Sequence, residues 1–200
     1  MTLPKLNEEN SVPVNVEQTS TEATPAGVMM KHWLEEIKES IPDFAKDVRL
    51  NLDAVYNRTT LSKELVEGCM LACAVAISNT RLSEYITSKV TINDKEFNAA
   101  ATAGTLMAQN NVWYPFVEMV DDPALKGLGA GLRMNAIATH GGTSKANFEA
   151  YSLAASIIGK CHFCVKAHYD TLKKEGFTVE QLRDIGRIAA VMNSVAKAIG

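Results

Sequence analysis

Two cysteines, a histidine and a glutamate near the C-terminal end of the chain have the types and spacing that thiol chemistry requires. Cys161 and Cys164 are three residues apart, His168 follows Cys164 by four, and Glu149 precedes Cys161 by twelve. On an α-helix, residues three apart have Cα atoms roughly 5 Å apart, which is within the range that a disulfide tolerates. The pair could therefore be oxidised and reduced without unwinding a helix.

The surroundings of the two thiols are expected to differ. His168 follows Cys164 at the spacing at which helical side chains meet, so we assign its imidazole to Cys164. Cys161 is nearer the helix start, where unpaired N–H groups and the helix dipole favour a thiolate, the species that attacks a peroxide oxygen or a disulfide sulfur. Glu149 could accept a thiol proton directly or through a water if its helix doubles back. Carboxylate, thiol and imidazole would then form a proton relay.

Two cysteines and a histidine at this spacing also occur in other kinds of protein site. Cys161, Cys164 and His168 could ligate zinc with Glu149 or His162 as the fourth ligand, but the sequence has no second CxxC or HxxxH motif to complete a usual structural site. Haem attachment requires a histidine directly after the second cysteine, and a thioredoxin-like fold requires strands. The sequence shows neither feature, so both alternatives are disfavoured. The redox interpretation is therefore favoured. The two remaining cysteines are predicted to be inert core thiols; they are Cys69 and Cys73.

The elements that must position these residues are all predicted to be helices. Apolar residues recur at helical spacing from about Met30 onward, and no segment keeps the alternation of a β-strand. The sequence therefore predicts an all-α fold. The expected helices cover residues 30–41, 44–57, 62–77, 82–89, a stretch starting at 93, 145–158, 161–175 and 178–199.

Three features are expected to shape the helices near the cysteines. Asn93 and Glu96 have the spacing of a capping box. Pro115 is expected to break the aromatic patch in residues 110–120, because proline cannot donate a helical hydrogen bond. Gly159 is expected to end the helix before the cysteines in a left-handed conformation.

Composition limits the functional classes. The 200 residues are 46% hydrophobic and can bury one core, and a net charge of -3 gives no basic patch for nucleic acid. No apolar run has the length of a membrane span and no signal pattern opens the chain, so we expect a cytoplasmic protein, where a CxxC points to redox or metal chemistry. Residues 1–28 are predicted to be a flexible polar tail, and residues 29–200 the helical domain.

The chain also shows a weak internal similarity. A shift of 82 residues places Glu67 on Glu149 and matches short segments around them, which predicts two related halves at about 44–120 and 130–200. Chance similarity between two Ala-rich amphipathic helices remains the alternative. The other aligned pairs are Ser62-Lys63 with Ser144-Lys145, Leu71-Ala72 with Leu153-Ala154, Asn79 with Cys161, and Leu82 with Cys164.

The glutamate, the CxxC pair and the following histidine resemble the signature of the alkyl hydroperoxide reductase D (AhpD) family, within the larger carboxymuconolactone decarboxylase-like group. The resemblance covers about residue 31 to the C-terminus. Beyond the motif it includes Phe44-Ala45-Lys46-Asp47, Leu50-Asn51-Leu52, Asn110-Asn111-Val112-Trp113-Tyr114, Leu132-Arg133-Met134-Asn135 and Lys145-Ala146-Asn147-Phe148-Glu149.

The resemblance implies an all-helical fold of two related halves, assembled as a homotrimer. It implies a thiol peroxidase that acts on alkyl hydroperoxides, binds no cofactor, and is re-reduced by an external lipoyl dithiol on a lipoyl-carrying protein. It also implies a role as a disulfide adaptor that reduces a partner peroxiredoxin. A redox adaptor with little peroxidase activity, and a non-catalytic zinc-binding helical protein, are the alternative functions.

The resemblance also implies roles for individual residues. Cys164 would attack the peroxide and become a sulfenic acid, Cys161 would be the proton donor and resolving thiol, and Glu149 and His168 would complete the proton relay. The helix start alone would instead activate Cys161 more strongly, so the residues by themselves leave the nucleophile open.

One position departs from the family pattern. Family members commonly have a histidine directly before the second cysteine, where this chain has Phe163, with His162 one residue earlier. That shift rotates the imidazole by about 100° around the helix. His162 is therefore only a possible accessory residue, and peroxidase turnover is expected to be altered while disulfide exchange survives.

Overall fold

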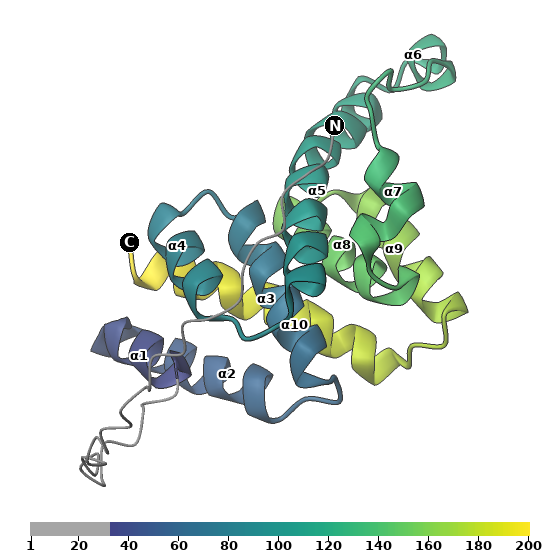
Figure 1. Cartoon of the computed structure of the whole chain (residues 1–200). Coiled ribbons are helices and arrows are strands. Elements are labelled where there is room, and N and C mark those ends of the chain that lie inside the picture. Colours follow the sequence, from purple (N-terminus) through teal and green to yellow (C-terminus); the bar gives the residue numbers. More distant parts are fainter. Residues whose placement is uncertain (1–32) are drawn as a thin grey trace, which may run out of the picture. The chain divides into compact units, whose positions relative to one another are not determined.

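The computed structural model describes residues 33–200 (Figure 1), so the predicted tail at 1–28 lies outside the described residues. The described part contains helices and no strand, which confirms the predicted all-α class. The α-helices are α1 Trp33–Ser40, α2 Lys46–Asn57, α3 Lys63–Ala76, α4 Thr80–Lys89, α5 Asp94–Val120, α6 Pro123–Gly127, α7 Asn135–Thr139, α8 Lys145–Gly159, α9 His162–Lys174 and α10 Val179–Ala198, with 3-10 turns η1 Asp43–Ala45 and η2 His140–Gly142.

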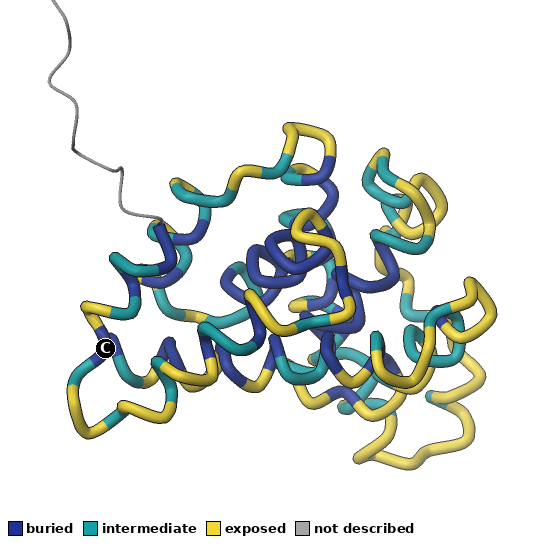
Figure 2. The backbone as a smooth tube through the Cα atoms, turned by 90° about the horizontal axis from the view of Figure 1, so that it is seen from below, coloured by how far each residue is buried: buried dark blue, intermediate teal, exposed yellow. Residues whose placement is uncertain are grey.

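The core lies where α3, α5 and α8 pack against one another, with α10 across α3 and α8 (Figure 1). Buried residues concentrate in this central group, whereas many exposed residues lie in the connecting loops (Figure 2). Small residues let α5 approach α3 closely: a Cβ on Gly104 would lie 2.8 Å from Val75 Cβ and 2.9 Å from the Ala72 carbonyl oxygen. Helix α9 packs on this group mainly through α8 and α5.

The start of α5 differs from the predicted capping box. The Asn93 side chain accepts a hydrogen bond from the Glu96 backbone N–H at 3.0 Å, so the cap itself is present. The Glu96 carboxylate, however, turns into the core and accepts hydrogen bonds from Tyr151 at 2.6 Å and from the Thr143 hydroxyl. Burial would raise the pKa of Glu96, but the Thr143 hydroxyl, the Tyr151 hydroxyl and Asn147 together hold it below its usual value. The Asn93 cap is kept, but the Glu96 side chain makes buried hydrogen bonds to Tyr151 and Thr143 in place of the reciprocal contact of a capping box.

Pro115 does not break the helix as the sequence predicted. α5 runs without interruption for 27 residues from Asp94 to Val120, with Pro115 inside it. Proline removes one i→i−4 hydrogen bond, but the helix continues across it, and α5 as a whole packs on α3, α8 and α9. The aromatic patch therefore belongs to a single helix that reaches the cysteine helix.

Corresponding helices in the two predicted halves start with capping residues at corresponding positions. Ser62 caps α3 and Ser144 caps α8, each by accepting a backbone N–H three residues later. The Asn79 side chain caps α4 in the same way, and Cys161, 82 residues later, caps α9. These matches agree with the predicted repeat, which itself stays a prediction.

Within residues 33–200, none of the helices combines the length and the apolar character that crossing a membrane requires.

Candidate active site

The site begins at the tight turn between α8 and α9. Lys160 has the left-handed conformation (φ 55°, ψ 30°) that the sequence analysis assigned to Gly159. Gly159 is still helical, and its missing side chain serves a different purpose. A Cβ there would overlap the Asn111 side chain, whose amide donates to the Ala155 carbonyl at 3.1 Å. Gly159 thus allows α5 to approach α8, and the turn at Lys160 sends the chain directly into the cysteines.

Cys161 is the N-cap residue of α9, and Cys164 lies in the first turn. The two sulfurs are joined in a disulfide with a Cα–Cα distance of 5.3 Å. The Cys161 sulfur also accepts a hydrogen bond from the Cys164 backbone N–H at 3.2 Å. Because helix-start N–H groups favour negative charge, this contact would stabilise a thiolate on Cys161 after reduction. Both cysteines were predicted to lie inside the helix, whereas Cys161 precedes the first turn of α9.

Both cysteines are buried. As whole residues, Cys161 is fully buried and Cys164 is 3% exposed. Burial therefore does not distinguish the two sulfurs as targets for an attacking thiolate or peroxide.

His168 and Glu149 are brought together as the predicted relay requires. Glu149, on α8, is 7% exposed, and one of its oxygens lies 2.7 Å from His168 Nδ1. The other ring nitrogen, Nε2, lies 3.2 Å from the sulfur of Met107 on α5. In this disulfide form the imidazole therefore contacts Glu149 and Met107, and no hydrogen bond among the described residues joins it to Cys164, to which the sequence analysis assigned it.

Four residues of α9 that include the motif each contact one residue of α5. The two helices are antiparallel here, so the partners on α5 have falling residue numbers as the numbers on α9 rise. The pairs are His162 Nδ1 with Glu118 Oε1 at 3.7 Å, Phe163 with Tyr114 as rings 4.6 Å apart and 27° from parallel, Cys164 Sγ with the Asn110 carbonyl oxygen at 3.9 Å, and His168 with Met107. We call these four contacts the α5–α9 ladder.

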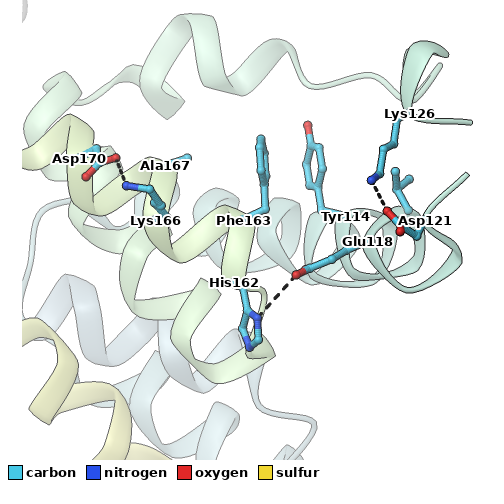
Figure 3. A pocket seen from close by; sticks show the side chains of 10 residues that line it. Tyr114, Glu118, Asp121, Lys126, His162, Phe163, Lys166, Ala167 and Asp170 are labelled. Carbon is cyan, nitrogen blue, oxygen red and sulfur yellow. Dashed lines mark hydrogen bonds and ion pairs between the residues drawn. The ribbon is translucent and has the colours of Figure 1, made fainter. Parts of the chain in front are cut away.

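A groove with a volume of about 840 Å³ opens beside the ladder, next to Phe163 (Figure 3). Its apolar part comes from the stacked rings of Tyr114 and Phe163 with Val117 and Ala167. Its charged side chains are paired with each other, as the dashed lines in Figure 3 show. The pairs are Glu118 with His162, Asp121 with Lys126, and Lys166 with Asp170 at 2.7 Å. The groove thus includes both residues that separate the two cysteines, His162 and Phe163, and its apolar surface lies around Phe163.

Sequence reasoning missed the residues of α5 that complete the site. Met107 and Asn110 have side chains or carbonyls directed at α9, and both are buried. Their spacing of three residues matched an ordinary core face, and no local pattern marked them as partners of a motif about 55 residues away. Only the antiparallel packing of α5 on α9 shows their role.

The structure also locates the other two cysteines and the side chains that could bind a metal ion. Cys69 and Cys73 are fully buried in α3, and burial raises the pKa of both thiols, so they remain protonated. Among residues 33–200 no three histidine, cysteine, aspartate or glutamate side chains are grouped to hold a metal ion. His162 is exposed and faces Glu118, away from His168 and its partner.

Comparison with known proteins gives a consistent result. Residues 123–199 match the model of the carboxymuconolactone decarboxylase family. The alkyl hydroperoxide reductase AhpD of Bradyrhizobium sp. (strain BTAi1) is 41% identical over 168 residues, which are 83% of this chain and 92% of that protein. The protein of the same name from Coxiella burnetii (strain Dugway 5J108-111) is 40% identical over 169 residues, 82% of this chain and 95% of that protein. That from Streptomyces avermitilis is 36% identical over 168 residues, 83% and 94% of the two chains.

Proposed function

The chain belongs to the AhpD family, and on that basis we propose that it is a thiol-dependent alkyl hydroperoxide reductase whose redox-active pair is Cys161 and Cys164. The observation that carries this proposal is the position of the Cys161–Cys164 disulfide at the start of α9, beside the Glu149–His168 pair. Such a site holds the two groups that thiol oxidation needs, a resolvable pair of sulfurs and a proton relay.

In the peroxide half-reaction the Cys164 thiol first gives its proton to His168. The Cys164 thiolate attacks the terminal oxygen of the hydroperoxide, so an S–O bond forms, the O–O bond breaks, and the alkoxide takes the proton of the Cys161 thiol to leave as the alcohol. The Cys161 thiolate then attacks the sulfenic acid of Cys164, so the S–S bond forms and the S–OH bond breaks, and the hydroxide takes a proton from solvent to leave as water. Membership of the AhpD family supports Cys164 as the attacking thiol.

In the reductive half-reaction an external dithiol, which we propose to be a lipoyl dithiol on a carrier protein, attacks Cys164. The S–S bond breaks and Cys161 leaves as a thiolate, where the Cys164 N–H can stabilise it. The second sulfur of the dithiol then attacks the sulfur bound to Cys164, which leaves as a thiolate and takes a proton. The dithiol ends as a cyclic disulfide, and both cysteines end reduced. No bound cofactor is needed in this scheme.

A redox adaptor that mainly reduces a partner peroxiredoxin is the second candidate, and Phe163 favours it. Phe163 is 56% exposed although it lies between two nearly buried cysteines. Exposed aromatic residues are enriched in protein interfaces, so a partner protein could bind over this ring. Fast reduction of a peroxiredoxin disulfide together with slow consumption of free hydroperoxide would favour the adaptor.

We also propose that the protein acts in the cytoplasm as a homotrimer. Support for assembly comes from the C-terminal half of α5, which exposes several large apolar side chains of the kind that mark interaction surfaces. They are Val112, Phe116, Met119 and Val120. Light scattering should give three times the 21.7 kDa mass of one chain.

The experiment for the main proposal measures hydroperoxide consumption with dihydrolipoamide as the reductant. The wild type should consume cumene hydroperoxide, whereas Cys164→Ser should lose consumption because no thiolate remains to attack the peroxide. Cys69→Ala should keep it, since that thiol lies buried in α3. Full activity of Cys164→Ser would refute the assignment.

A further inference from the structure

We propose that Met107 is a positioning residue for the proton relay, and that its thioether holds the Nε2–H of His168 ready for transfer to Cys164. The inference rests on the proposed thiol function. Met107 is fully buried on α5, and its sulfur lies 3.2 Å from Nε2. Nothing in the sequence motif includes this residue, because it lies 61 positions before the histidine.

The hydrogen-bond inventory of the ring supports this role. As a carboxylate, Glu149 can only accept a hydrogen bond, and a thioether can likewise only accept. The two ring nitrogens of His168 face these two acceptors, at 2.7 Å and 3.2 Å. A neutral imidazole carries one N–H and satisfies only one of them, whereas the ring with protons on both nitrogens satisfies both. The Met107 contact therefore needs an N–H on Nε2 as its donor, and this is the proton that we propose passes to Cys164.

The chemical softness of the acceptor explains why a methionine suits this position. Sulfur in a thioether is a weak acceptor, so it orients the Nε2–H without holding the proton as tightly as a carbonyl or a second carboxylate would. A thiolate is a much stronger acceptor. When Cys164 leaves as a thiolate during re-reduction, the proton on Nε2 can pass from His168 to the Cys164 sulfur.

The α5–α9 ladder places Met107 suitably for this transfer. Met107 and Asn110 are three residues apart and share one face of α5. The Asn110 carbonyl oxygen lies 3.9 Å from the Cys164 sulfur. Two neighbouring contacts therefore lie along this face of α5. The Met107 sulfur contacts Nε2 of His168, and the Asn110 carbonyl oxygen contacts the Cys164 sulfur that needs the proton.

The test compares Met107→Leu with the wild type. Leucine has nearly the same volume but accepts no hydrogen bond. With dihydrolipoamide and cumene hydroperoxide, we expect kcat to fall about tenfold, since proton transfer by a positioned side chain contributes far more than that, while KM for the hydroperoxide stays within about twofold. Met70→Leu is the matched control, because Met70 is equally buried but lies on α3, and it should keep the wild-type kcat.

A spectroscopic measurement separates positioning from packing. Nitrogen-15 NMR of the oxidised wild type should show a slowly exchanging proton on Nε2 of His168, and this signal should be lost or exchange rapidly in Met107→Leu. Protein labelled with selenomethionine keeps a chalcogen acceptor and should retain both the signal and kcat. Wild-type kcat together with an unchanged Nε2 signal in Met107→Leu would overturn the inference. Absence of hydroperoxide turnover in the wild type would refute the proposed function instead, and the NMR comparison would still decide the role of Met107.

Discussion

At the scale of single residues, Cys161 and Cys164 have different surroundings although they are bonded to each other. Cys161 has the N–H of the helix start, whereas Cys164 lies one helical turn from His168. In the proposed cycle the backbone would therefore stabilise the charge left on Cys161, and a side chain would supply the proton needed at Cys164. This division of roles agrees with the assignment of Cys164 as the attacking thiol.

Glu149 gives a prediction that its counterpart Glu67 can control. Glu149→Gln keeps an acceptor near His168 Nδ1 but removes the carboxylate of the proposed proton relay. We expect kcat to fall by about 100-fold or more, the usual contribution of a positioned acid–base pair, with an unchanged fold by circular dichroism.

Glu67 is buried at the aligned position of α3 and accepts hydrogen bonds from the Tyr56 hydroxyl at 2.7 Å and the Thr91 backbone N–H at 2.6 Å. Glu67→Gln should lower the melting temperature yet keep kcat, because no part of the site depends on it. Equal kcat losses in the two variants would mean that Glu149 acts only through stability.

At the scale of elements, α9 packs on α8 and α5, and the α5–α9 ladder is the part of this packing that contacts the motif from α5. The stacked rings of Tyr114 and Phe163 form its exposed step. Aromatic pairs contribute about 0.5–1.5 kcal/mol beyond their buried area. A double-mutant cycle of Tyr114→Ala and Phe163→Ala, measured by urea unfolding, should give a coupling free energy in about that range. A coupling near zero would show that the two rings do not interact in solution.

The local sequence predicted most helices and singled out Glu149 and His168, but it assigned His168 to Cys164 and could not predict what α5 contributes. The spacing of apolar residues along a helix and most capping residues depend on neighbours in the sequence, so the sequence alone predicts them. Pro115 was misinterpreted because its cost is local whereas the packing that outweighs it is tertiary. Gly159 was misinterpreted because a glycine before a turn suggests a left-handed cap, while the close approach of Asn111 is visible only in three dimensions. Met107 has no sequence signal apart from its burial.

At the scale of the whole molecule, buried acids tie segments that are distant in sequence. Asp184 on α10 is 2% exposed and accepts hydrogen bonds from the Thr60 backbone N–H at 2.8 Å and from Arg187 at 2.9 Å. This contact fixes the α2–α3 connection to the last helix. α10 in turn packs on α8, which carries Glu149, so the tie supports the site indirectly.

Asp184 also makes stability depend on pH. Burial would raise its pKa, but the Thr60 backbone N–H, Arg187 and the hydroxyls of Thr60 and Thr59 together hold it well below its usual value. A depressed carboxyl pKa stabilises the fold above the unfolded value of about 3.9 and loses that stabilisation as pH falls below it. Asp184→Asn should therefore cost about 1–3 kcal/mol at pH 7, and its unfolding free energy should fall less steeply than that of the wild type below about pH 4. Parallel acid curves in urea unfolding would contradict this role.

The central claim is that hydroperoxide oxidises one specific pair of thiols, and thiol counting tests it most directly. The chain has four cysteines, so fully reduced protein should show four thiols on denaturation, and one equivalent of cumene hydroperoxide should remove two. Mass spectrometry of the alkylated peptides should place the new disulfide between Cys161 and Cys164 and leave Cys69 and Cys73 alkylated. Unchanged thiol numbers, or a disulfide that includes Cys69 or Cys73, would contradict the account.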